Sequence, residues 1–294
     1  MGWPLRDLGR KAVGFDNLEP QTPMQMPAAN AYAAAALARS RAAASECRAV
    51  LDVAYGPDRK HRLDLYLPGA RVTGTPVLIF LHGGSWTHGY KEWMGLTAPA
   101  LVDLPAIFIA ANYRLAPTHR FPAQLEDTLA ILAWAAAEIE AYGGDRARIF
   151  LGGHSAGGHL ATLATLRRDL WPRHGIAGGA VRACLPVSTT FDYRGCPEDA
   201  GSFLARPEDA GEASPIAHVE GNRVPFLIAY GGADFERAKL TSRAMAAALT
   251  KTGCVASEME VAGADHFEMS LGSGDRGHPW TRAVRAWLAR GEPP

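Results

Sequence analysis

FLGGHSAGGHL, residues 150–160, places a single serine, Ser155, among glycines at the end of an apolar run. Residues 153–157 fit the pattern G-x-S-x-G, with a predicted strand before the serine and a predicted helix after it. Two interpretations compete. The segment is a flexible glycine turn that contains a hydroxyl by chance, or it is a turn so tight that only glycine fits around an exposed nucleophile. The rest of the chain has to decide between them.

The residues on both sides of this turn alternate between short apolar runs and longer helical stretches. The predicted strands cover residues 48–55, 61–68, 76–82, 106–113, 148–153, 181–191, 224–232 and 255–261, and the predicted helices cover residues 28–46, 91–103, 122–142, 156–168 and 279–290. The first two strands alternate polar and apolar residues, which is typical of half-buried antiparallel edge strands. Strands that alternate with helices of this length form βαβ units. The order therefore predicts an α/β fold with a mostly parallel, doubly wound sheet of eight strands.

The chain shows no internal repeat and no linker, so a single domain is predicted over residues 1–294. Residues 1–46 are predicted to form an N-terminal arm and an alanine-rich helix that lies over the body of the domain or over a site entrance. Residues 194–223 interrupt the strand–helix alternation. Because they leave the end of a predicted strand, they are predicted to form a short cap insertion over the carboxyl edge of the sheet.

The composition argues against several functional classes. Lys plus Arg and Asp plus Glu both total 30, with no long run of one sign, which argues against a nucleic-acid or polybasic membrane surface. No stretch reaches the ~18 apolar residues of a membrane span, and residues 1–20 lack the apolar core of a secretory signal. The four cysteines are scattered without a C-x-x-C pair, as expected of reduced thiols. We therefore expect a cytoplasmic protein.

An acid and a histidine that could activate Ser155 follow it in the order expected for this motif. Asp234 comes just after the predicted strand 224–232, where a catalytic carboxylate would stand, although a helix-capping role would also explain it. Glu236 is the alternative acid. His266 follows the last predicted strand, and His278 is the alternative base. The sequence predicts a Ser155–His266–Asp234 triad.

A second glycine pair, in FLHGGSW at residues 80–86, follows a predicted buried strand. Backbone N–H groups of Gly83 and Gly84, together with that of Ala156, are predicted to form an oxyanion hole. The alternative is an ordinary Gly-Gly turn, which is common. The G-x-S-x-G motif about 70 residues later makes it unlikely that the two glycine motifs occur together by chance. The residues predicted to line the substrate pocket are Ser85, Trp86, His154, Phe203 and Leu204.

Neither a metal nor an organic cofactor is expected. The glycines of GGHSAGG cannot be spaced as G-x-G-x-x-G, so the dinucleotide-binding pattern fails. The histidines at positions 82, 88, 154 and 159 do not have the spacing of a zinc-binding helix motif. The expected chemistry is nucleophilic catalysis through an acyl-enzyme, which these side chains can carry out alone.

The segments HGGSW (82–86), NYRLAP (112–117), FPAQLED (121–127) and GHSAGGHL (153–160) resemble the α/β-hydrolase superfamily, and the resemblance extends over residues 48–290. Within it they are similar to the esterase/lipase group related to hormone-sensitive lipase and to the kynurenine formamidase (arylformamidase) group. GGADFERAKLTSRAM (231–245) also looks like the acid-bearing segment of the formamidases. The chain departs from the lipase pattern at Ser85, which replaces a third glycine, and at His154 before the nucleophile.

The resemblance implies a serine hydrolase of small carboxylic esters or aryl formamides, with an ester or amide as its small-molecule partner. An acyltransferase or cyclase that uses the same triad is the alternative within enzymes. A ligand-binding protein on this scaffold would be expected to lack a triad member, whereas Ser155, Asp234 and His266 are all present. A homodimer is left open.

Overall fold

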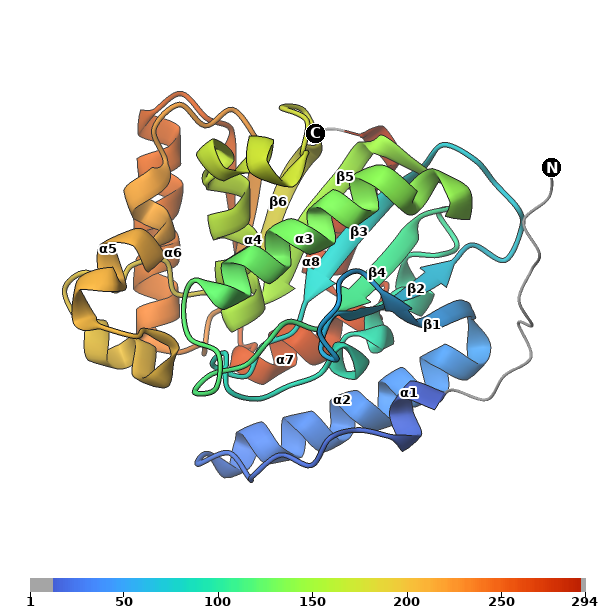
Figure 1. Cartoon of the computed structure of the whole chain (residues 1–294), viewed down its shortest axis with the longest axis horizontal. Coiled ribbons are helices and arrows are strands. Elements are labelled where there is room, and N and C mark those ends of the chain that lie inside the picture. Colours follow the sequence, from blue (N-terminus) through green and yellow to red (C-terminus); the bar gives the residue numbers. More distant parts are fainter. Residues whose placement is uncertain (1–12, 292–294) are drawn as a thin grey trace.

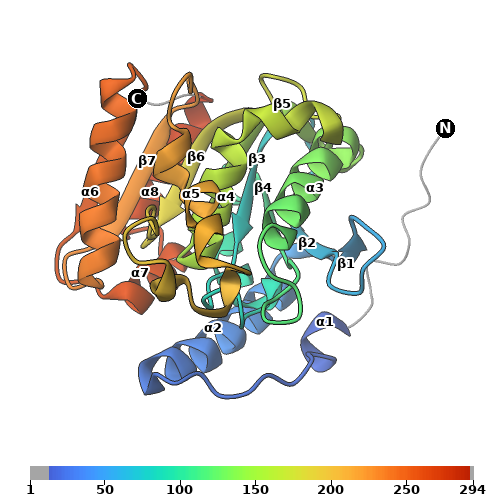
Figure 2. The same ribbon diagram turned by 60° about the vertical axis from the view of Figure 1, so that its left-hand side comes forward.

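The computed structural model describes residues 13–291, in which eight strands form a single sheet (Figures 1 and 2). Their order across the sheet is β1-β2-β4-β3-β5-β6-β7-β8. The strands are β1 (Arg48–Ala54), β2 (Arg62–Leu67), β3 (Thr75–Leu81), β4 (Ile107–Ala111), β5 (Gly144–His154), β6 (Val181–Val187), β7 (Phe226–Gly231) and β8 (Ala256–Val261). The β1–β2 and β2–β4 pairs are antiparallel, and every other pair is parallel. The predicted α/β fold is confirmed.

Helices cover both faces of the sheet (Figures 1 and 2), and the alternation of side chains along each strand feeds two separate cores. In β3, Val77 and Ile79 pack into one core, and Leu78 and Phe80 pack into the other. The first core includes α3 (Ala123–Glu138), α4 (Ala156–Leu166) and α6 (Glu236–Lys251); the second includes α2 (Pro27–Glu46), α7 (His266–Leu271) and α8 (Pro279–Arg290). Burial on both faces explains the continuous apolar runs of the central strands.

Two predicted elements differ from the structure. Residues 61–68 were expected to form a half-buried edge strand, but β2 lies between β1 and β4 and is buried along most of its length. The helix predicted over residues 91–103 is instead two 3₁₀ segments, η1 (Lys91–Trp93) and η2 (Gly95–Ala100). Pro99 lies inside η2, and a proline removes a hydrogen-bond donor that a continuous α-helix needs.

Helix α2, in the described N-terminal part of the chain, packs mainly on η1, η2 and α7. Of the predicted arm, residues 1–12 lie outside the described residues. A short helix, α1 (Val13–Asp16), is followed by an irregular segment and then by α2, which Figure 1 shows beside α7. The Tyr32 hydroxyl of α2 hydrogen-bonds the Ser270 hydroxyl of α7 at 2.9 Å. The alanine-rich helix therefore packs on the element that begins with His266.

Residues 194–223 contain only short helices, as their prolines and glycines predict. These are η5 (Pro197–Phe203), η6 (Pro207–Asp209), α5 (Ala210–Ala213) and η7 (Pro215–His218). Three further 3₁₀ segments are η3 (Ile139–Tyr142), η4 (Arg168–His174) and η8 (Gly272–Gly274). Among the described residues, none of the helices combines the length and the apolar character needed to cross a membrane.

Candidate active site

Ser155 occupies a strained turn between β5 and α4. Its backbone has φ 53° and ψ −119°, a conformation that side-chain-bearing residues rarely adopt. A Cβ added to Gly153 would lie 2.4 Å from the carbonyl carbon of Gly157, and one added to Gly157 would lie 2.2 Å from the carbonyl oxygen of Leu81. Strand and helix therefore approach too closely for any residue but glycine. The turn is tightly packed rather than a flexible glycine loop.

Asp234 and His266 meet at the same edge of the sheet. Asp234 follows β7, and its side chain is completely buried. Its Oδ1 lies 2.8 Å from Nδ1 of His266 and 2.7 Å from the N–H of Phe235. Burial alone would raise the pKa of Asp234, but its hydrogen bond and electrostatic interaction with His266 hold that pKa below its ordinary value. Asp234 therefore stays a carboxylate that can orient the imidazole.

A capping box fixes the backbone at His266, the first residue of α7. The Asp265 side chain accepts hydrogen bonds from the N–H groups of Phe267 and Glu268, both at 2.8 Å. The Glu268 carboxylate in turn accepts from the N–H of Asp265 at 2.9 Å. Sequence reasoning missed this support, although the D-x-x-E spacing of Asp265 and Glu268 is a readable signal.

The alternative acid and base stand elsewhere. Glu236 is exposed on α6, where its carboxylate pairs with Lys239. His278 is the residue before α8, and its ring packs against Gly272. Of the four side chains considered, the structure brings Asp234 and His266 together.

Of the three predicted oxyanion residues, Gly83 contacts Ser155 in space and Ala156 follows it in the sequence. A Cβ on Gly83 would lie 3.2 Å from the Cβ of Ser155, so the two backbones are in close contact. Ala156 begins α4, and an N–H in the first turn of a helix has no intrahelical acceptor. The chain then turns sharply through Gly84, Ser85 and Trp86, with φ of 112°, 51° and 59°. Positive φ values at Ser85 and Trp86, which are not glycines, mark a strained turn directly after the Gly83–Gly84 pair.

The predicted pocket residues fall into two groups. Ser85 is exposed, whereas Trp86, His154, Phe203 and Leu204 are buried. Trp86 and Phe203 stack with their ring centroids 4.1 Å apart, which joins residues 194–223 to the turn after Gly84. Phe203 is completely buried. Its replacement by alanine would leave a cavity and cost about 3–5 kcal/mol of stability, so it is a poor probe of selectivity.

His154 packs against His266. Its Nε2–H donates to the carbonyl oxygen of His266 at 2.9 Å, and the two ring centroids are 4.7 Å apart. Burial, together with the nearby His266, lowers the pKa of His154 to about 3. His154, the residue before Ser155, is therefore a neutral hydrogen-bond donor that connects the end of β5 to the start of α7.

Phe235 was not singled out by the sequence. Its ring lies against that of His266, with centroids 4.5 Å apart, and 44% of the residue is exposed. An exposed aromatic ring in this position gives the outer side of His266 an apolar surface. Its place directly after Asp234 was the only available signal.

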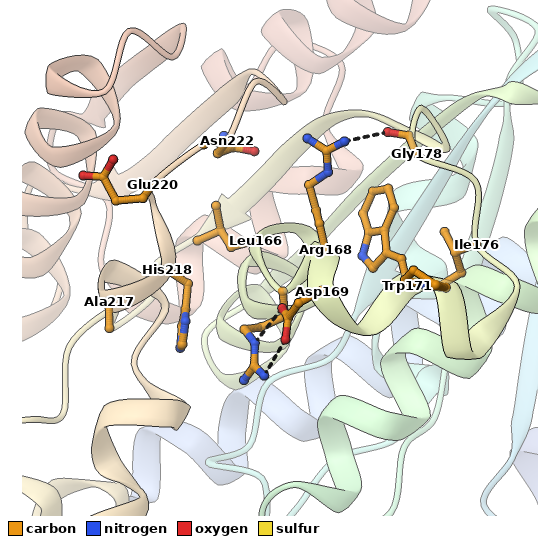
Figure 3. Close-up of a pocket in the computed structure, with 13 residues that line it drawn as sticks. Leu166, Arg168, Asp169, Trp171, Ile176, Gly178, Ala217, His218, Glu220 and Asn222 are labelled. Atoms are coloured by element: carbon orange, nitrogen blue, oxygen red, sulfur yellow. Dashed lines mark hydrogen bonds and ion pairs between the residues drawn. The ribbon is translucent and has the colours of Figure 1, made fainter.

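A hollow of about 570 Å³ lies at the far end of α4 (Figure 3). Leu166, the last residue of α4, lines it and lies about 16 Å from Ser155 along the helix axis. Arg168 also lines it, and its guanidinium donates to the carbonyl of Gly178 at 3.1 Å. This hollow is separate from the candidate active site. Among residues 13–291, no group of three His, Cys, Asp or Glu side chains is placed to hold a metal ion.

The buried histidines predict a pH-dependent stability. Burial lowers the pKa of His159 from 6.5 to about 4, although its Nε2–H donates to the Ala213 carbonyl at 2.6 Å. Between those two values the unfolded chain binds more protons than the folded chain, so stability is lost as the pH falls from 6.5 toward 4. His159→Gln is expected to reduce the slope of the unfolding free energy against pH by about 1.4 kcal/mol per pH unit. Urea unfolding of both proteins at pH 4.5 and 6.5 measures it, and equal slopes would contradict a neutral His159.

Two family models match the sequence. That of the BD-FAE family covers residues 63–171, and that of the prolyl oligopeptidase family covers residues 123–291, more than half of the chain. The chain belongs to the prolyl oligopeptidase family. Ser155 lies within both matched ranges, and Asp234 and His266 lie within the second.

This member of the prolyl oligopeptidase family is also similar to curated esterases. Esterase LipC of Mycobacterium tuberculosis is 33% identical over 261 residues, which make up 80% of this chain and 64% of LipC. The chain spans about half to two thirds of the length of the curated relatives it matches.

Solved structures share the fold. An esterase of Pyrobaculum calidifontis has a TM-score of 0.73 at 23% identity, covering 88% of this chain and 91% of that protein. EstE1, a thermophilic carboxylesterase from a metagenomic library, has a TM-score of 0.71 at 24% identity, covering 89% and 97%. This prolyl oligopeptidase family member therefore has the α/β-hydrolase fold, and its likeness to esterases is confirmed. The likeness to kynurenine formamidases gains no support from these relatives.

Proposed function

We propose that this protein is a serine hydrolase of small carboxylic esters, with Ser155 as nucleophile, His266 as general base and Asp234 as its partner. One arrangement carries the proposal. His154 precedes Ser155 and hydrogen-bonds the His266 backbone, while the His266 ring hydrogen-bonds the buried Asp234 carboxylate. These contacts hold the acid and the base against the end of β5, where the strained turn presents Ser155.

The proposed reaction follows from the chemistry of these groups. The Ser155 hydroxyl attacks the ester carbonyl as His266 takes its proton, and Asp234 holds the Nδ1–H and stabilises the imidazolium. The tetrahedral oxyanion accepts hydrogen bonds from the N–H of Ala156 and from the Gly83–Gly84 turn. His266 then protonates the departing alcohol, and water cleaves the acyl-enzyme by the same route.

The substrate class is proposed from the relatives and from Phe235. LipC and EstE1 are described as an esterase and a carboxylesterase. The departing alcohol receives its proton from His266, so it must lie beside that ring. The exposed Phe235 ring stands on His266 and offers an apolar contact to such a group. We therefore favour esters with an apolar or aryl alcohol over formamides.

The cap of residues 194–223 is proposed to close one side of the same pocket. The Phe203 ring stacks on Trp86, and the Phe203 carbonyl accepts from the Phe121 N–H at 2.8 Å. Trp86 in turn follows the proposed oxyanion glycines by two positions. A single domain whose cap and sheet share one core is the organisation that these contacts support.

The experiment is active-site labelling followed by a substrate panel. We expect a fluorophosphonate probe to modify the full-length protein at Ser155, because an activated serine attacks the phosphorus. The panel pairs p-nitrophenyl acetate, butyrate and octanoate with an N-formyl aryl amine, with and without an added alcohol acceptor. Ester hydrolysis supports the proposal. Turnover of the formamide alone, acyl transfer to the alcohol alone, or no labelling of the folded protein would each contradict it.

A further inference from the structure

We propose that Gln21 is a positioning residue for the oxyanion turn. It belongs to the irregular segment between α1 and α2, far from Ser155 in the sequence. The inference rests on the proposed function, because it assigns a role in stabilising the oxyanion of that reaction. Gln21 acts on the turn through Gly89 and does not itself touch the reacting atoms.

The side-chain amide of Gln21 satisfies both backbone groups of Gly89. The Gly89 N–H donates to Oε1 of Gln21 at 2.8 Å, and Nε2 of Gln21 donates to the Gly89 carbonyl at 3.1 Å. A carboxamide carries a donor and an acceptor side by side, so it can pair with a peptide unit as a neighbouring strand does. No carboxylate or ammonium group can make both of these bonds.

Gly89 transmits this contact to the oxyanion turn. It has φ 105°, and a Cβ added there would lie 2.3 Å from Nδ1 of His82 and 2.5 Å from the carbonyl oxygen of Gly83. The same Gly83 oxygen accepts the Nδ1–H of His82 at 2.7 Å. On its other side Gly83 is in contact with Ser155. The contacts therefore run from Gln21 to Gly89, then to Gly83, and end at the proposed nucleophile.

The segment that carries Gln21 is itself fastened on both sides. Before it, the Glu19 carboxylate pairs with Lys60 at 2.6 Å and with Arg59 at 3.1 Å, and the Glu19 carbonyl accepts the Tyr90 hydroxyl. After it, the Thr22 carbonyl accepts the Nε2–H of His88 at 3.0 Å. Residues 19–22 therefore run alongside residues 88–90, and the Gln21 amide is held in register with Gly89.

A small displacement of this turn is costly for catalysis. Removal of an oxyanion donor costs about 10²–10³-fold in kcat, and a misplacement of about 1 Å can cost 10²-fold. The oxyanion forms both when the acyl-enzyme is made and when it is hydrolysed. Loss of the Gln21 contact should therefore lower kcat whichever step limits the rate, and it should leave substrate binding unchanged.

The test compares Gln21→Ala with Gln25→Ala, which removes an exposed glutamine from the same segment. With p-nitrophenyl butyrate as substrate, Gln21→Ala is expected to lower kcat by about 10–10²-fold with KM within twofold. The affinity for a trifluoromethyl ketone, which forms a tetrahedral adduct on the serine, should fall in parallel. Gln25→Ala should match the wild type in all three measurements.

Gln21→Glu provides a second variant of nearly the same shape. Its carboxylate can still accept from the Gly89 N–H but cannot donate to the Gly89 carbonyl, so a loss of kcat is again expected. This variant decides the question if Gln21→Ala does not fold. Wild-type kcat and ketone affinity in a folded Gln21 variant would overturn the inference and leave the proposed function intact. An inactive, unlabelled wild-type protein would overturn both.

Discussion

Ser155→Ala is expected to lower kcat for ester hydrolysis by about 10⁴-fold or more. The hydroxyl is the group that the proposal places in bond formation with the acyl carbon, and alanine has nothing to replace it. The small rate that remains would come from substrate binding and from the Gly83–Ala156 oxyanion donors, acting on a water molecule. Burst and steady-state kinetics with p-nitrophenyl acetate measure both the acylation and the residual turnover.

The variant is expected to fold, which makes the result interpretable. The Ser155 N–H donates to the Val187 carbonyl at 2.8 Å, and the Ser155 carbonyl accepts the His159 N–H at 3.0 Å. Neither bond uses the hydroxyl, and alanine can adopt the positive φ at a cost similar to that of serine. A melting temperature close to that of the wild type is the control. A folded Ser155→Ala protein that retains wild-type turnover and fluorophosphonate labelling would end the proposal of a Ser155 nucleophile.

Asp234→Asn is expected to lower kcat by about 10⁴-fold, close to the loss at the nucleophile. The Asp234 carboxylate accepts the Nδ1–H of His266 at 2.8 Å, which leaves Nε2 free to take a proton. An asparagine amide can instead donate to Nδ1, which holds the imidazole in the tautomer that cannot act as a base. The substitution also removes the negative charge that stabilises the imidazolium in a site where the acid is buried.

Glu236→Gln is the matched control for Asp234→Asn. Glu236 is two residues further along the chain and exposed, with its carboxylate paired to Lys239 at the surface. The Lys239 side chain is only 15% exposed, but the Glu236 side chain is 75% exposed, so water screens the pair and it contributes little. We expect kcat within twofold of the wild type. A large loss in Glu236→Gln combined with a small one in Asp234→Asn would show that the acid had been assigned to the wrong residue.

Local signals were sufficient for most of the fold. The strand–helix alternation predicted the parallel sheet, and α8 begins and ends where the pattern placed it. Errors arose where packing overrides periodicity. The polar and apolar alternation of β2 indicated an edge strand. The strand is interior because β1 and β4 pair with its two sides, and it is buried because α2 and η2 cover one of its faces. Asp64 provides the polar face of β2, and it is buried in an ion pair with Lys91.

For the candidate site too, some features are visible in the sequence and others only in the folded chain. Glycines at positions 153 and 157, a serine between them, and an acid and a histidine after the later strands are all short-range patterns, because each reflects one turn or one strand end. The sequence by itself therefore determined the α/β class, the candidate nucleophile and the order of the triad candidates. It favoured Asp234 over Glu236 from its place at the strand end, but which of the two side chains points at His266 is seen only in the folded chain.

Tertiary structure decided the contacts between distant segments. The bond from His154 to His266 spans 112 residues and that from Gln21 to Gly89 spans 68, and neither leaves a periodic trace in the sequence. The same holds for the Trp86–Phe203 stack that joins residues 194–223 to the turn after Gly84. Backbone conformation and hydrophobic period are set within a few residues. Which distant groups meet is set by how the helices pack on the sheet, and only the folded chain contains that information.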